Sequence, residues 1–321
     1  VYAARPDREA ERNSLFKDMQ RLRSDMQSGS QGSTYHSMRM STYEEMRTFA
    51  DETSHDLRLS LDAMRQVTMM LSGLPGRKSI VHISSGLPMV AGKDLFHEYQ
   101  SIYQDDSHAL SLDARYNLRR EYRALISSAN AQGVRLYTID ASGITTTSGV
   151  SSEFAYSLDP ITASIGVNNY QESLQYMAER TGGLAILNAN DVTDGLTKIR
   201  QDIFTYYSLG YPISSAGGDK VHTIKVEIPA HPEYRVRYRR TFVEKSLESK
   251  VQDAVMSALI FDVKENPMDI VVTSGQPMPA TEDRSIVPIA TSVPLESVAL
   301  IPEGDDYVGR VVLFVAARDR E

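Results

Sequence analysis

The strongest constraint on the fold is a regular alternation between short β-branched runs and stretches with helical spacing. The runs Ile80–Ser84, Val134–Ile139 and Leu184–Leu187 are separated from one another by such stretches. Short apolar runs that alternate with helices are typical of buried parallel strands joined by right-handed crossovers. Because the alternation is repeated along the chain, the sequence predicts an α/β fold with a doubly wound, mainly parallel sheet.

The helical stretches carry apolar stripes that predict which faces are buried. The stripes comprise Leu57, Leu61, Met64 and Leu71; Leu118, Tyr122, Leu125, Ile126 and Ala129; Leu174 and Met177; and Leu196, Ile199 and Ile203. Glycine or Gly-Pro segments close several of these helices, and Asp191 or Thr193 can cap the last one. Upstream, residues 8–25 are helix-prone, whereas the polar stretch 29–41 is expected to form a loop.

The period changes to two beyond Tyr206. The segments Val221–Ile228 and Tyr234–Arg239 alternate between apolar and polar residues, which predicts antiparallel strands. The first unit, residues 1–243, is therefore expected to be the α/β domain with closing β-strands. Arg235, Arg237, Arg239 and Arg240 form a basic strip that is either a solvated strand face or a surface for an acidic partner.

The C-terminal part, residues 244–321, is expected to be a small antiparallel, β-rich, sandwich-like domain that is truncated at its end. Ser246–Ala258 predicts a connecting helix or linker, and prolines punctuate the strands that follow. These strands include Ile286–Ile289 and Arg310–Ala316. A polar stretch around 244–250 marks the expected boundary.

Composition excludes several classes of partner. The formal net charge is −8 and the pI is near 5.5, which argues against nucleic acid and anionic lipid as general partners. The longest uncharged apolar run, Val311–Ala317, is far shorter than the roughly 18 residues of a spanning helix, so no membrane insertion is expected in this segment. The chain has no cysteine, which removes disulfides and thiolate chemistry and leaves the compartment open.

Motifs for catalysis are missing from the sequence. No Gly-x-Ser-x-Gly elbow, phosphate-binding loop, dinucleotide fingerprint or His-x-x-x-His pair occurs. His82 lies within an expected strand and is interpreted as a packed residue rather than a base. The sequence therefore predicts no catalytic residues and a protein that is not an enzyme.

A set of motifs resembles one family in the correct order. They are Leu74–Lys78 followed by Ile80–Pro88, Gly133–Asp140, Ala178–Gly183, Tyr206–Pro212 and His222–Val226. Together they resemble bacterial VWFA-related proteins, which contain a von Willebrand factor type A-like domain. The resemblance covers residues 57–242 and implies a Rossmann-like sheet in an extracytoplasmic protein, either periplasmic or secreted.

The resemblance also implies what this chain lacks. The family's first strand ends in Asp-x-Ser-x-Ser, which contributes to a metal-ion-dependent adhesion site (MIDAS). We expect the chain to begin after that strand, and Ser85-Gly86 stands where related domains often have Asp-Gly. Asp140-Ala141-Ser142 matches the start of the motif, but Ile144 replaces its last serine. The expectation is a degenerate MIDAS with no metal, unless ligands upstream complete a magnesium site.

The predicted binding site lies where the strands end. Ligands of doubly wound sheets bind at the carboxyl ends of the strands, which selects Ser84, Ser85, Asp140 and Ser142. The expected function is non-enzymatic binding or scaffolding of another protein, whose identity the sequence does not give. The alternatives are a serine-dependent hydrolase and a purely structural subunit of a larger assembly.

Overall fold

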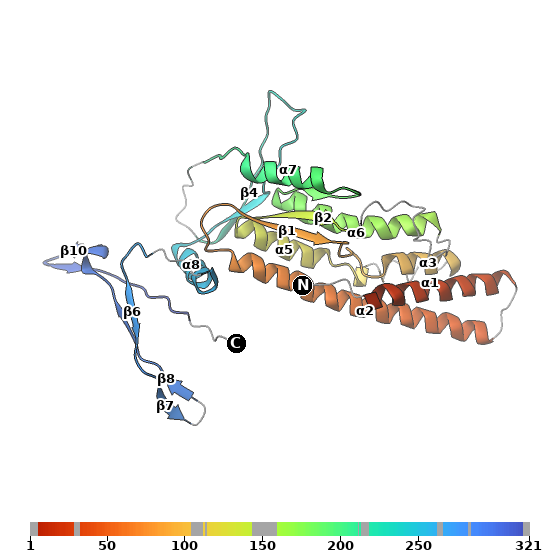
Figure 1. The fold of residues 1–321 in the computed structure, drawn as a ribbon, viewed down its shortest axis with the longest axis horizontal. Coiled ribbons are helices and arrows are strands. Elements are labelled where there is room, and N and C mark those ends of the chain that lie inside the picture. The colour runs from red at the N-terminus through yellow and green to blue at the C-terminus, as the bar shows by residue number, and fades with distance from the viewer. Residues whose placement is uncertain are drawn as a thin grey trace.

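A three-stranded parallel sheet lies at the centre of the α/β part. The computed structural model describes residues 6–28, 33–103, 112, 114–142, 159–210, 212, 218–261, 266–281 and 284–316. The sheet contains β1 (Lys78–Ser84), β2 (Val134–Asp140) and β3 (Ala185–Ile186) in that order (Figure 1). Both pairings are parallel, so the predicted parallel arrangement of these runs is confirmed.

The helices of the described chain pack on the two faces of this sheet or against one another. They are α1 (Pro6–Gln27), α2 (Ser33–Met70), α3 (Lys93–Tyr103), α5 (Arg119–Ala131), α6 (Pro160–Thr181), α7 (Thr193–Phe204) and α8 (Leu247–Phe261). Because side chains alternate along a strand, Val134 and Leu136 of β2 join the main core with α2, α5 and α6. Tyr137 and Ile139 instead join a smaller core with Ile199 of α7.

The apolar stripes of the helices are largely buried as expected. Leu57, Leu61, Tyr122 and Leu125 lie in the main core, and Gly182 ends α6 in a left-handed conformation. Leu196, however, is 45% exposed. The prediction for this residue was wrong because Gly195 and Ile199 form the stripe that faces the sheet, and Gly195 lies directly against Ile186.

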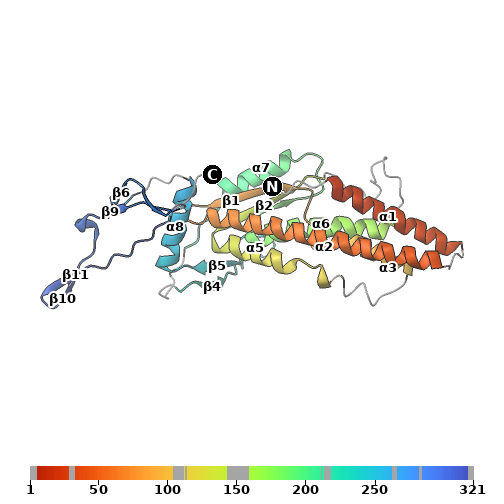
Figure 2. The same cartoon turned by 90° about the horizontal axis from the view of Figure 1, so that it is seen from below.

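The loop expected at residues 29–41 is largely helical, because α2 already begins at Ser33. Contacts with α3 explain the difference. Tyr35 packs against Tyr103 with ring centroids 6.4 Å apart, and the Arg39 guanidinium lies 4.4 Å from the centroid of the same ring. These tertiary contacts outweigh the weak intrinsic helix propensity of the segment. As a result α1 and α2 form a long pair that extends past the sheet (Figure 2).

Buried ion pairs attach α1 to α3. Arg12 donates from Nε to Oδ2 of Asp94 over 2.8 Å, and the Asp94 side chain is only 4% exposed. Arg23 lies 3.4 Å from Oε1 of the buried Glu98, whose Oε2 accepts a hydrogen bond of 2.8 Å from Thr162 of α6. A buried carboxylate is stable only when it is paired, so these contacts fix the position of α1.

The antiparallel strands after α7 differ from the expected pair. β4 (Lys220–Thr223) pairs with β5 (Thr241–Glu244), and not with Tyr234–Arg239. The arginines of that segment contact helices instead: Arg235 lies 3.3 Å from Glu179, and Arg237 lies 2.8 Å from Asp202.

These ion pairs give the basic strip acidic partners within its own chain. Burial raises the pKa of Asp202, but hydrogen bonds from Arg237 and Tyr137 outweigh it, so the pKa lies below its usual value. Asp202 therefore holds a charged contact to Arg237 at neutral pH.

The last part of the described chain forms small antiparallel sheets. β6 (Val271–Ser274) pairs with β9 (Ile289–Ser292), β7 (Met278–Thr281) with β8 (Arg284–Ile286), and β10 (Ile301–Glu303) with β11 (Asp306–Val308). A short 3₁₀ helix, η1, spans Leu295–Ser297. None of the described residues from 266 onward is buried.

Two strand predictions in this part were wrong. Ile286–Ile289 is not one strand, because β8 ends at Ile286 and β9 begins at Ile289, with Pro288 between them. Proline cannot donate to a ladder, which explains the break. Arg310–Ala316 forms no strand. The division at residues 243 and 244 stays a prediction.

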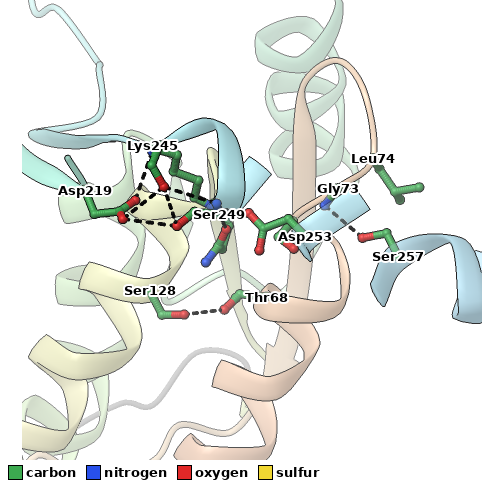
Figure 3. Close-up of polar contacts among 12 residues, drawn as sticks. Thr68, Gly73, Leu74, Ser128, Asp219, Lys245, Ser249, Asp253 and Ser257 are labelled. Carbon is green, nitrogen blue, oxygen red and sulfur yellow. Dashed lines mark hydrogen bonds and ion pairs between the residues drawn. The ribbon is translucent and has the colours of Figure 1, made fainter. Parts of the chain in front are cut away.

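The segment expected to be a helix or linker is the helix α8, which packs against the end of α2 (Figure 3). Ser257 Oγ donates to the Met70 carbonyl and accepts from the Gly73 N–H, both over 2.8 Å. A Cβ on Gly73 would lie 2.3 Å from the Asp253 carbonyl oxygen, so only glycine permits this approach. Lys245 contacts both Gln132, the residue that follows α5, and Asp253.

Candidate functional site

Two neighbouring strands end side by side at the predicted site. Ser84 is in register with Asp140, and the Ala141 N–H donates to the Ser84 carbonyl over 3.0 Å. The Ser84 hydroxyl accepts a hydrogen bond of 3.1 Å from the Gly86 N–H. Gly86 has φ +97°, and a Cβ there would approach Tyr170 to 2.9 Å, so glycine is required at this turn.

Asp140 is the most buried polar group of this edge, with 3% of its surface exposed. Its Oδ1 accepts hydrogen bonds from the Ser142 N–H, over 3.0 Å, and from the Ser142 hydroxyl. Its Oδ2 accepts from Nε2 of Gln171, on α6, over 3.2 Å. Both carboxylate oxygens are therefore engaged by neighbours within the chain.

Two residues of the cluster were missed from sequence. Gln171 Nε2 also lies 2.6 Å from Oδ1 of Asn188, and Asn188 Nδ2 donates to Gln171 Oε1 over 3.3 Å. Asn188 follows β3 with φ 54°, a conformation that asparagine tolerates better than most residues. The rule that selected Ser84 and Asp140, a polar residue after a strand, could have found Asn188. A glutamine on an amphipathic helix gives no such signal.

Ser85 is placed differently from the other candidates. Ser84, Asp140 and Ser142 come together, whereas the Ser85 side chain is exposed and forms no hydrogen bond to a described residue. We call Ser84, Asp140, Ser142, Gln171 and Asn188 the edge cluster. Ser85 borders the edge cluster in sequence and faces solvent.

Known proteins provide no guide to this site. The chain matches no family model, no curated protein and no solved structure. The resemblance to VWFA-related proteins therefore stays a prediction.

The residues present do not fit a divalent cation. Among the described residues no three His, Asp or Glu side chains gather in a way that could hold a metal. Asp140 is the single carboxylate of the edge cluster, and both its oxygens already accept hydrogen bonds. Magnesium favours several oxygen ligands in octahedral geometry, which this arrangement does not offer.

We expect the chain to show no magnesium or manganese binding at millimolar metal. Isothermal titration calorimetry of the wild type should match that of Asp140→Asn, which removes the carboxylate charge. A micromolar dissociation constant that the substitution abolishes would contradict this expectation.

The described serines show no hydrolase geometry. The hydrogen bonds of His97, His222 and His231 go to Thr162, Glu244 and Glu233 rather than to a serine, whereas an activated serine needs an adjacent base. His82 is the histidine nearest to Ser84 in sequence, but its Nε2 is buried without a hydrogen-bond partner in the described chain, and burial lowers the pKa of its imidazole.

None of the described helices has the length and apolar composition needed to cross a bilayer.

Proposed function

We propose that this chain is a non-enzymatic, protein-binding module of a secreted or envelope bacterial protein. The edge cluster is its contact surface, and its fold is a doubly wound, von Willebrand factor A-like sheet with a degenerate MIDAS. One observation carries the proposal: a buried carboxylate, Asp140, holds polar side chains from separate elements at the carboxyl edge of the sheet.

The chemistry of the edge favours binding over catalysis. Ser142 and Asn188 are exposed. A hydrogen bond to Asp140 fixes the orientation of the Ser142 side chain, and one to Gln171 fixes that of Asn188. A preorganised rim of hydroxyl and amide groups can form hydrogen bonds with a complementary protein surface at little entropic cost. The extracytoplasmic location rests on the family resemblance alone.

The layered arrangement supports the finer fold assignment. α2, α5 and α6 lie on one face of the sheet and α7 lies on the other, as in a doubly wound sheet. In such sheets the carboxyl ends of the strands form the ligand crevice. The edge cluster occupies that position.

Site-specific photo-crosslinking in the source cells tests the function. A benzophenone side chain at the exposed Ser85 should give one discrete adduct with another protein, and Asp140→Ala should abolish that adduct. The matched control places the same group at the exposed Glu248 on α8, where no such adduct should form. Adducts that are equal at both positions, or unaffected by Asp140→Ala, would contradict the proposal.

A serine-reactive fluorophosphonate distinguishes the hydrolase alternative. We expect no labelling of the folded chain, because the hydroxyls of Ser84 and Ser142 contact Gly86 and Asp140 rather than a histidine. Stoichiometric labelling that Ser84→Ala or Ser142→Ala removes would favour a hydrolase.

A further inference from the structure

Four tyrosines form a continuous row between α2 and α3. Tyr35 and Tyr43 come from α2, and Tyr99 and Tyr103 come from α3. The ring centroids of Tyr43 and Tyr99 lie 5.5 Å apart. Those of Tyr99 and Tyr103, which are one helical turn apart, are separated by 4.5 Å, and Tyr103 lies 6.4 Å from Tyr35. We call these four residues the tyrosine row.

The amino-acid composition makes tyrosine the side chain that a one-electron oxidant attacks. The chain contains 17 tyrosines but no cysteine and no tryptophan. Methionine is oxidised to its sulfoxide by gain of an oxygen atom, which is a different reaction. Removal of a single electron from this chain therefore produces a tyrosyl radical.

The fate of such a radical depends on its neighbours. The other ring contacts among the described residues each contain at most one tyrosine. A radical on an isolated surface ring, such as that of Tyr307 on β11, couples only after collision with another molecule. In the tyrosine row, by contrast, the next phenol is already in contact. The row is thus the place in the described chain where two tyrosyl radicals can meet within one molecule.

Arg39 holds the two α3 rings of the row side by side. Its Nε donates to the Tyr99 hydroxyl over 3.1 Å, and its guanidinium carbon lies 4.4 Å from the centroid of the Tyr103 ring. One side chain therefore contacts both rings, through a hydrogen bond and a cation–π interaction. Tyr99 and Tyr103 are half-buried. A small oxidant can reach them while the packing against α2 keeps them adjacent.

We propose that the tyrosine row is the site at which oxidation cross-links this chain, and that the bond forms between Tyr99 and Tyr103. An outer-sphere one-electron oxidant removes one electron from each phenol, and each phenol loses its hydroxyl proton to water. The two phenoxyl radicals join through ring carbons ortho to their oxygens, and the hydrogens on those carbons move to the oxygens. Two oxidant molecules are reduced, and the dityrosine has two hydrogens fewer than the two tyrosines.

Photo-oxidation of the folded full chain with tris(bipyridine)ruthenium and persulfate tests the proposal. Trypsin cleaves after Lys93 and Arg115, with no lysine or arginine between them, so residues 94–115 form one peptide that carries both tyrosines. We expect this peptide to lose two hydrogens in mass spectrometry and to show dityrosine fluorescence. The yield per chain should not depend on protein concentration, because the coupling is intramolecular.

Tyr103→Phe should abolish the loss of two hydrogens, because phenylalanine forms no phenoxyl radical. The Tyr103 hydroxyl is buried without a hydrogen-bond partner among the described residues, so its removal should leave the packing of α3 intact. Tyr99→Phe should have the same effect on the cross-link. The matched control is Tyr307→Phe, which removes a tyrosine that is 71% exposed and should leave the modification of 94–115 unchanged.

Several results would overturn the proposal. They are an unmodified peptide 94–115 in the wild type, a loss of two hydrogens that persists in Tyr103→Phe, and dityrosine that occurs mainly in covalent dimers. A cross-link between 94–115 and a peptide of α2 would also contradict the assignment of the bond to Tyr99 and Tyr103. The site is separate from the edge cluster, so these outcomes leave the proposed binding function untouched.

Discussion

Gly183→Ala is expected to lower the free energy of unfolding by about 3 kcal/mol, because the added methyl group overlaps backbone atoms of the central strand. A Cβ at this position would lie 2.0 Å from the Leu136 carbonyl oxygen and 2.8 Å from its carbon. Neither atom belongs to a flexible side chain, so the backbone of β2 and the segment that joins α6 to β3 must move apart. Urea denaturation followed by circular dichroism measures the change.

Gly210→Ala is the matched control. A Cβ there meets no heavy atom within 4 Å, so its effect should stay within about 0.5 kcal/mol. Equal stabilities for the two variants would mean that the α6–β3 turn does not pack against β2 in this way.

Arg12→Met is expected to cost about 3 kcal/mol of unfolding free energy, because it leaves the Asp94 carboxylate buried without its partner. The Asp94 side chain is 4% exposed and Arg12 is 24% exposed. Solvent reaches part of the guanidinium, which places the expected loss at the lower end of the range for buried pairs. Thermal and urea unfolding both report it.

A double substitution separates the ion pair from simple packing. Arg12→Met with Asp94→Leu should recover most of the lost stability, because no buried charge remains. Arg21→Met is the control, since Arg21 is 73% exposed and its contact with Asp18 is a surface pair worth about 0.5 kcal/mol or less. A double variant as unstable as Arg12→Met alone would show that the charge on Asp94 is not the cause.

The parallel sheet was predictable because its signals are local. Val134–Ile139 is a short run in which apolar residues predominate and both faces are buried, and the stripe containing Leu57 and Leu61 has a clear helical period. The helical start of α2 was not predictable, because it depends on Tyr103, a residue far away in the sequence. The same holds for the segment Tyr234–Arg239, whose arginines pair with α6 and α7 rather than with a strand.

The candidate site was predictable only where strand ends determine it. Ser84, Asp140 and Ser142 follow from the positions at which β1 and β2 end. Gln171 reaches Asp140 from the middle of α6, and only the packing of that helix on the sheet brings the two together. Contacts of this kind depend on the assembled layers and leave no local pattern in the sequence.

The position of α8 determines which contacts would break first if the C-terminal part of the chain were pulled. The C-terminal sheets follow α8 in sequence, and their described residues have no buried core of their own. A pull on them therefore acts first on the contacts of Ser257 with Met70 and Gly73, and then on the bonds of Lys245. Segments with few buried contacts open at a lower free energy than the strands of a buried core. Under stretching the C-terminal part would extend while β1, β2 and the edge cluster keep their geometry.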